Sequence, residues 1–200
     1  YGTITDSLSP RFVGLLLASA LIHRARTGEG QYIDLSQVEG GIVCLSESIL
    51  TWTGTGEVLT RVGNRSRHAA PHGVFRCAAE GGDDDRWVAI AVHDEVEWQR
   101  FRSAIGAPPW ALAARFATLE ERLRNVEALE RCVEDWTRPR LAADVTAVLQ
   151  AAGVTAAVVQ NFEDLHRDPQ LAHRGHFRAV EHRVVGRHVC EMMGLRLSAS

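Results

Sequence analysis

The stretch TDSLSPRFVGLLLASALIHRARTGEGQYIDLSQVEGG, residues 5–41, decides the fold, because it holds one long apolar segment between two sets of helix-boundary signals. Ser9 followed by Pro10 is typical of a helix start, since a serine side chain accepts from free backbone N–H groups and proline needs no N–H at the first position. The residues that follow have almost no polar face. This pattern predicts a helix over about 10–26 that is buried on most sides and ends at the two glycines of TGEG.

Beyond this helix, QYIDL (31–35) predicts a short strand. SQVE (36–39) has the spacing of a capping box, in which Ser36 and Glu39 satisfy each other's backbone donors. A second helix is therefore expected from about residue 36 or 37 to Trp52.

The rest of the chain has signals for a separate α+β unit. Residues 53–72 lack apolar periodicity and contain many Gly, Thr and Arg residues, so they are predicted to be a linker or long loop. The elements expected after it are a hairpin of 73–78 and 86–92, helices at 95–105 and 119–136, a helix after Pro139, a strand at 154–159, a short helix at 162–169 and a hairpin from Phe177 to the end. Asp94 with Glu97 and Thr118 with Glu121 have the spacing of capping boxes that open the helices at 95–105 and 119–136. Apolar residues of the second of these helices recur every three or four positions and predict one buried stripe: Leu119, Leu123, Val126, Leu129, Val133 and Trp136.

Composition bounds the function classes. The 200 residues are 46% apolar and 24% charged, which predicts a globular chain, and a net charge of −3 gives no general attraction to nucleic acid. No uninterrupted apolar stretch reaches the ~18 residues of a membrane span, so we expect a soluble chain, and one that is a fragment because it starts at Tyr1. Four cysteines without a CxxC pair predict small buried apolar side chains in a reducing compartment, the cytoplasm.

Two motifs suggest metals and are better explained without them. Five histidines fall within 166–188, but the spacing of His173 and His176 is loose and no carboxylate or thiolate is fixed beside them. The run DDD at 83–85 lacks the remaining ligands of a calcium loop and is predicted to be a solvated turn. We therefore expect no metal site.

Asp6 is the candidate for covalent chemistry. Within the polar stretch TDSLSP an aspartate is commonly a local cap that binds nearby N–H groups. The apolar helix behind it also brings a positive dipole end close to the carboxylate, which would keep it ionised in a poorly solvated place and usable as a nucleophile. Both interpretations remain open at this point.

The chain resembles the class III CoA-transferase family, which includes formyl-CoA transferase, carnitine CoA-transferase and the similar α-methylacyl-CoA racemase. The resemblance rests on residues 5–41, on RVGNRSRHAAPHGVF (61–75), on WVAIAV (87–92) and on GVTAAVVQNFEDLHRDPQLAHRGHF (153–177). The most specific parts are the Asp twenty-five positions before the Gln of TGEGQ, which are Asp6 and Gln31, and the run DPQLAHRGHF.

The resemblance implies the chemistry. An aspartate at the place of Asp6 attacks an acyl-CoA thioester, and a carboxylic acid takes over the CoA, so that coenzyme A thioester is a substrate and no cofactor is permanently bound. A glycine-rich loop shields the site in formyl-CoA transferase. Here Arg65, Ser66, Arg67 and His68 stand in the corresponding stretch, and we expect them to bind substrate, or else to form a solvated basic loop.

The resemblance also implies the fold class, an α/β protein with two domains in an interlocked homodimer. Residues 1–52 would be the end of a Rossmann-like large domain, 53–72 a linker, 73–155 a small α+β domain and 156–200 a return segment toward the large domain. Two alternatives to CoA transfer remain, namely a racemase that moves the α-proton of an acyl-CoA, and an inactive fragment that serves only as an interaction module.

Overall fold

The computed structural model describes residues 4–192, 194 and 198 of the chain. It mixes helices with antiparallel sheets and divides into two compact units, which we call unit 1 (Tyr1–Arg61) and unit 2 (Val62–Ser200).

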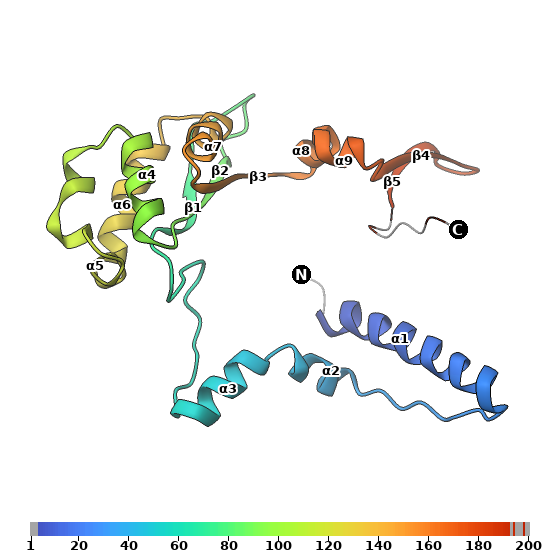
Figure 1. Ribbon diagram of the computed structural model, residues 1–200. Coiled ribbons are helices and arrows are strands. Elements are labelled where there is room, and N and C mark those ends of the chain that lie inside the picture. Colours follow the sequence, from blue (N-terminus) through green and yellow to red (C-terminus); the bar gives the residue numbers. More distant parts are fainter. Residues whose placement is uncertain (1–3, 193, 195–197, 199–200) are drawn as a thin grey trace. The chain divides into compact units, whose positions relative to one another are not determined.

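Unit 1 contains three helices, α1 (Ile4–Thr27), α2 (Gln37–Val43) and α3 (Ser46–Thr55), drawn in blue to cyan in Figure 1. The predicted cap of α2 is confirmed, since the Ser36 side chain accepts from the Glu39 N–H at 3.3 Å. The single helix expected up to Trp52 is wrong. It divides at Cys44 and Leu45, whose N–H groups bond three residues back instead of four, and this tightening ends the first helix.

The predicted start of the first helix is also wrong. Helix α1 begins at Ile4 and continues through Pro10, where Ser9 and Pro10 had been expected to open it. Pro10 lies inside the helix, and because proline has no N–H group the bond from residue 10 to the Asp6 carbonyl is lost. Asp6 therefore lies in the first turn of the helix and not in a turn before it.

Residues 31–35 form no strand. A strand requires a neighbour to accept and donate its backbone hydrogen bonds, and the described part of unit 1 contains helices and irregular segments only. The expected burial of α1 is wrong for this chain as well, because large apolar side chains remain exposed on it: Val13, Leu15, Leu16, Leu17, Leu21 and Ile22.

The centre of unit 2 is a three-stranded antiparallel sheet in the order β1 (His72–Arg76), β2 (Trp87–Ala91) and β3 (Thr155–Val159). The β1–β2 hairpin confirms the hairpin that the turn signals predicted. Side chains alternate between the two faces of these strands. Phe75, Val88 and Ile90 point into the core, whereas the opposite face, here called the outer face, carries small residues such as Ala89 and its partner Ala157.

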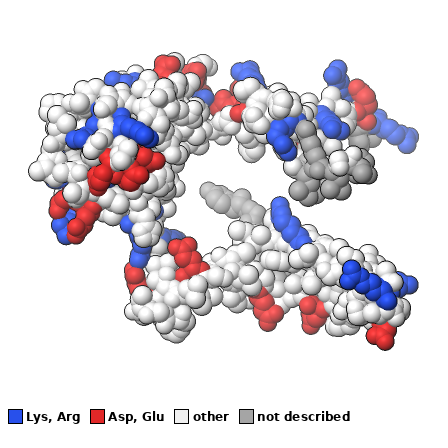
Figure 2. All heavy atoms as spheres, in the orientation of Figure 1, with Lys and Arg blue, Asp and Glu red and all other residues white. Residues whose placement is uncertain are grey.

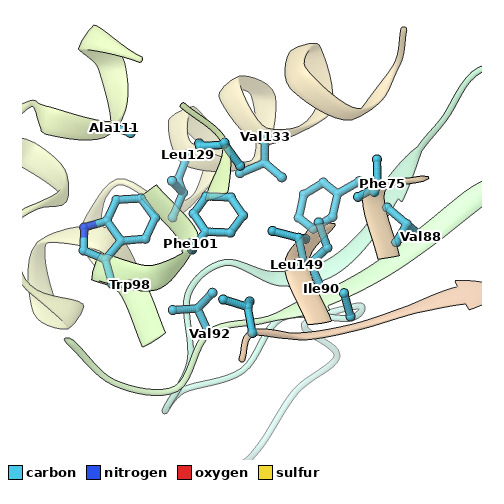
Figure 3. Close-up of a cluster of buried hydrophobic side chains, with 14 of the residues drawn as sticks. Phe75, Val88, Ile90, Val92, Trp98, Phe101, Ala111, Leu129, Val133 and Leu149 are labelled. Carbon is cyan, nitrogen blue, oxygen red and sulfur yellow. The ribbon is translucent and has the colours of Figure 1, made fainter. Parts of the chain in front are cut away.

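Helices α4 (Glu95–Ala104), α6 (Val126–Thr137) and α7 (Ala142–Ala151) supply the other side of the core. Figure 3 shows Trp98 and Phe101 of α4, Leu129 and Val133 of α6 and Leu149 of α7 gathered with the buried strand side chains. The short 3₁₀ helices η1 (Pro109–Leu112) and η2 (Ala114–Phe116) follow α4. Burial of this cluster stabilises unit 2 through the hydrophobic effect.

The helix predicted over 119–136 is divided in the structure. Helix α5 (Leu119–Arg124) ends at Asn125, and α6 begins at the next residue. The Asn125 amide donates to the carbonyl oxygens of Glu121 and Arg115, so the side chain competes with the backbone for helical acceptors, as asparagine often does. The caps predicted at Asp94 and Thr118 are confirmed.

The chain continues through α8 (Phe162–Arg167) and α9 (Pro169–His173) into a two-stranded hairpin of β4 (Phe177–His182) and β5 (Gly186–Glu191). The predicted C-terminal hairpin is thus confirmed up to Glu191. Its expected continuation to the end falls mostly outside the described residues.

The four cysteines do not share one environment. Cys77 is buried in the core, and burial raises the pKa of its thiol to about 11. Cys132 and Cys190 are half-buried, and Cys44 is exposed. The expectation of four buried apolar side chains is therefore wrong for Cys44, which lies between two helices of unit 1.

Candidate active site

The Asp6 carboxylate is exposed in the first turn of α1, a helix of 24 residues. The unpaired N–H groups of a first helical turn carry a partial positive charge and favour a negative side chain there. The placement within the helix gives Asp6 the dipole that was expected from a turn in front of it.

Helix α2 packs closely on the start of α1. A Cβ atom at Gly41 would lie 3.0 Å from Cγ2 of Thr5, the residue before Asp6, and one at Gly40 would lie 3.5 Å from the ring of Phe12. Gly41 allows the backbone of α2 to approach at this distance, whereas the contact at position 40 would be an ordinary one. Gly41 therefore helps to fix the turn of α1 that carries Asp6.

Arg65 opens the basic stretch that was predicted to bind substrate, and it belongs to unit 2. Its Nε atom donates to Oε1 of Glu130 at 2.9 Å, and Nη2 donates to Oε2 at 2.7 Å. This is the two-pronged geometry that makes arginine–carboxylate pairs strong. The hydrogen bond to Glu130 holds the pKa of Arg65 above its ordinary value.

The three other predicted residues follow directly. The Ser66 hydroxyl accepts from the His68 N–H at 3.0 Å, which closes a small turn. Ser66 is half-buried, whereas Arg67 and His68 are exposed. The structure thus groups all four predicted residues in one loop of unit 2, and Asp6 belongs to unit 1.

The end of this loop is fixed in the core. Ala69, Ala70 and Pro71 are buried. The Ala70 N–H donates to the Val92 carbonyl, and Nε of Arg122 donates to the Ala70 carbonyl at 2.8 Å. The segment predicted to be a linker therefore ends in residues that are part of the unit 2 core.

A cavity of about 390 Å³ lies between this loop and the outer face of the sheet. Its walls are Gly63, Asn64 and Arg65 on one side and mostly small sheet residues on the other: His72, Gly73, Val74, Ala89, Ile90, Ala91, Thr155, Ala156 and Ala157. Nδ1 of His72 lies 2.5 Å from the Asn64 carbonyl oxygen and ties the loop to β1. The cavity has the size and the apolar lining of a small-ligand site.

The histidines of the C-terminal segment pack on rings. His166 lies 4.1 Å from Phe177 and His182 lies 6.0 Å from His188, measured between ring centroids. Within the described residues no three His, Cys, Asp or Glu side chains come together as metal ligands would. Among all the residues that the structure describes, no helix combines the length and apolarity of a membrane span.

Sequence reasoning missed Glu130 and Arg122. Both act through partners more than fifty residues away, and local spacing carries no information on such pairs. The available signal was indirect. Glu130 follows the buried stripe residue Leu129 on α6, which places it at the border of the core.

Comparison with known proteins assigns the chain. The sequence model of CoA-transferase family III matches residues 2–200. A probable CoA-transferase of Mycobacterium tuberculosis is 35% identical over 91% of this chain and 22% of its own length. Acetyl-CoA:oxalate CoA-transferase of Acetobacter aceti is 30% identical over 86% of this chain and 43% of its own length.

Other similar proteins agree. Succinyl-CoA–D-citramalate CoA-transferase of Chloroflexus aurantiacus is 27% identical over 99% of this chain and 48% of its own length. The crystal structure of a CaiB/BaiF family protein from Brucella suis superposes with a TM-score of 0.83 at 26% identity, covering 100% of this chain and 50% of the other.

The chain belongs to CoA-transferase family III. The match to the Brucella structure supports the α/β fold class that the resemblance implied. The chain spans half or less of the length of these relatives.

Proposed function

We propose that the protein containing this chain transfers CoA from an acyl-CoA to a carboxylic acid, with Asp6 as the nucleophile. The observation that carries the proposal is the exposed carboxylate in the first turn of α1 in a chain that belongs to CoA-transferase family III. The attacking group must be a carboxylate, and the first turn of a helix places partial positive charge beside it.

The reaction proceeds by covalent exchange. The Asp6 carboxylate attacks the carbonyl carbon of the donor acyl-CoA, and the carbon–sulfur bond breaks. CoA leaves as thiolate, and the donor acyl group stays on Asp6 as a mixed anhydride. The thiolate then attacks the Asp6 carbonyl, which releases the donor acid and leaves an aspartyl-CoA thioester. An acceptor carboxylate repeats these steps in reverse and regenerates Asp6. The covalent intermediates divide one difficult exchange into several easier steps, which is the benefit of covalent catalysis.

The loop of Arg65, Ser66, Arg67 and His68 is proposed to border the acyl part of the substrate. Arg65, together with Gly63 and Asn64 before it, forms one wall of the cavity on the outer face of the unit 2 sheet. Two of the relatives are named for oxalate and D-citramalate, both dicarboxylic acids. Small dicarboxylic acids are therefore the acceptors to test first.

The whole protein is proposed to be a homodimer in the cytoplasm. The division into a large-domain end, a linker, a small domain and a return segment likewise remains a proposal. The exposed apolar side chains of unit 1 support the part that concerns assembly, since a surface of this kind normally contacts another protein segment.

The test is to trap the intermediate and to remove the carboxylate. Incubation with acetyl-CoA or succinyl-CoA, followed by hydroxylamine and peptide mass spectrometry, should label Asp6. Asp6→Asn keeps the shape but not the nucleophile, so CoA transfer should fall by at least ~10³ while acyl-CoA binding changes little.

Glu29→Gln is the matched control, because Glu29 is another exposed carboxylate of unit 1, and it should transfer CoA at the wild-type rate. A label on a different residue, or near wild-type transfer by Asp6→Asn, would remove Asp6 from the mechanism. Exchange of the α-proton of a 2-methylacyl-CoA without CoA transfer would replace the proposal by the racemase. A protein that does neither would be an interaction module.

A further inference from the structure

The pair of Arg65 and Glu130 joins two elements that are 65 residues apart in the sequence. Glu130 stands on α6 next to Leu129, and Val133 follows one turn later; both of these apolar side chains are fully buried. The carboxylate is therefore presented by a helix that the core holds rigidly. The side chain of Glu130 is 24% exposed, so water screens the pair only in part.

The loop between Gly63 and His68 is held at both ends. Arg65 fixes its first half to α6 through two hydrogen bonds. The buried residues 69–71 fix its second half to the core, through the backbone bond to Val92 and the donor atom of Arg122. Only three residues, 66–68, lie between the two anchors.

The positive charge of Arg65 is balanced by carboxylates of α6. The edge of the guanidinium formed by Nε and Nη2 is occupied by Glu130, and Oε1 of Glu127 lies 3.8 Å from Nη1. A substrate carboxylate would have to displace Glu130 to gain the same two-pronged contact. Arg65 also forms part of the cavity wall, so its position determines the shape of that wall.

We propose that Arg65 is a positioning residue, which latches the loop of residues 63–68 onto Glu130 and keeps the wall of the cavity in place. The loop is then a fixed wall and not a mobile lid. The effect on catalysis rests on the proposed function, whereas the effect on the order of the loop does not.

The first experiment measures the loop directly, by hydrogen exchange of the peptide that spans 62–68 in the intact protein. Glu130→Gln removes the charge and one of the two acceptors, and we expect exchange there to become about fivefold faster, the scale of one charged hydrogen bond at a partly exposed site. The strand peptide 87–92 should keep its wild-type exchange, which shows that the core stays folded.

Two further variants complete the hydrogen-exchange experiment. Glu127→Gln is the matched control, because Glu127 lies on the same helix near Arg65 but accepts no hydrogen bond from it and is 71% exposed; it should change the exchange of 62–68 less than about twofold. The double variant Arg65→Glu with Glu130→Arg can re-form the pair with reversed charges and should restore slow exchange. Wild-type exchange in Glu130→Gln would overturn the proposal.

The second experiment separates positioning from direct binding of the acid, with acetyl-CoA and oxalate or succinyl-CoA and citramalate as probes. If Arg65 bound the acceptor carboxylate, Glu130→Gln would release the guanidinium and lower KM for the acid. If Arg65 instead positions the loop, kcat should be several-fold lower in both Glu130→Gln and Arg65→Lys, and KM for the acid should not fall. The charge-reversed pair should restore kcat.

A lower KM in Glu130→Gln would therefore also overturn the positioning role. If the wild type transfers CoA to neither acid, the proposed substrates fail, and the hydrogen-exchange result alone decides on the latch.

Discussion

The guanidinium of Arg122 is fully buried in unit 2, and its position shows how a charge can stabilise a core. Nε donates to the Ala70 carbonyl at 2.8 Å, and Nη1 donates to Oε2 of Glu95 at 2.9 Å. The other oxygen of Glu95 accepts from the Leu119 N–H, and the guanidinium lies 4.8 Å above the Trp98 ring. One side chain thus links the loop before β1 with the starts of α4 and α5.

Replacing Arg122 by Met should keep most of the volume but leave the Ala70 carbonyl and Glu95 without their donor. We expect a loss of about 2–4 kcal/mol in the free energy of unfolding, below the full cost of breaking a buried pair because Glu95 is half exposed. Urea unfolding of the intact protein measures this change in the free energy of unfolding. Arg124→Met is the control, since Arg124 pairs only with exposed carboxylates and should cost less than about 1 kcal/mol. Equal losses in both variants would contradict the special role of Arg122.

Single residues also show what the sequence can predict. The caps at Ser36, Asp94 and Thr118 were found from spacing alone, because a capping side chain and the backbone N–H that donates to it are three residues apart. The partners of Arg65 and Arg122 could not be found in this way, since they depend on how α6 packs on the loop and how α5 packs on α4 and Ala70. Asp6 as a candidate came from local pattern and family resemblance, and its role remains a prediction.

Among the elements, α8 is tied to the turn between β1 and β2 by Arg86. The side chain of Arg86 is 10% exposed, and Nη1 donates to Oδ2 of Asp164 at 2.8 Å. Glu80 and Asp83 of the turn lie 3.4 and 3.6 Å from the same guanidinium. The turn that was expected to be merely solvated therefore takes part in a network with the start of a helix.

The network predicts a dependence of stability on pH. The hydrogen bond from Arg86 lowers the pKa of Asp164 below 3.8, its usual value. A lowered folded-state pKa adds stability that is complete above the unfolded value and is lost as pH falls through the folded one. Asp164→Asn should therefore destabilise the protein by about 1–2 kcal/mol at pH 7, and the difference from wild type should shrink below pH 3.8.

Denaturant unfolding at pH 7 and at pH 3 measures this difference. Asp135→Asn provides the control, because Asp135 is exposed on α6 and its replacement should give the same small difference at both pH values. A difference for Asp164→Asn that stays constant with pH would show that the ion pair contributes nothing measurable.

Element boundaries were the least predictable part of the fold. The β1–β2 hairpin and α4 follow from local signals and are confirmed. The strand expected at 31–35 is absent, because pattern alone cannot supply a neighbour to pair with. The long helix at 119–136 was correct in its buried stripe but not in its continuity, since Asn125 interrupts it while Leu129 and Val133 still face the core.

At the scale of the whole chain, the two units differ in how they are stabilised. Unit 2 encloses a cluster of buried apolar side chains. In the described part of unit 1, Ser9 is the only buried residue, and large apolar side chains of α2 and α3 such as Val43, Leu50 and Trp52 are exposed. The surface over these helices is mostly white in Figure 2, with few charged groups.

We therefore expect the fragment 62–200 to fold alone and the fragment 1–61 not to. The first should unfold in urea with one cooperative transition, because its core is complete. The second should show reduced helical circular dichroism and no sigmoidal transition, since α2 and α3, with 7 and 10 residues, are too short to be stable alone in water and no core holds them to α1. A monomeric 1–61 that unfolds cooperatively would contradict this account of unit 1.

The contact between Gly41 and Thr5 has a consequence for natural variation. A methyl group added at position 41 would lie 3.0 Å from Cγ2 of Thr5, which is closer than ordinary packing permits. Alanine at 41 then needs the Thr5 side chain to shift by a few tenths of an ångström, and serine at 5 would remove the need because it lacks that methyl group. Substitutions at positions 5 and 41 should therefore occur together among related sequences, in combinations that keep the position of Asp6 unchanged.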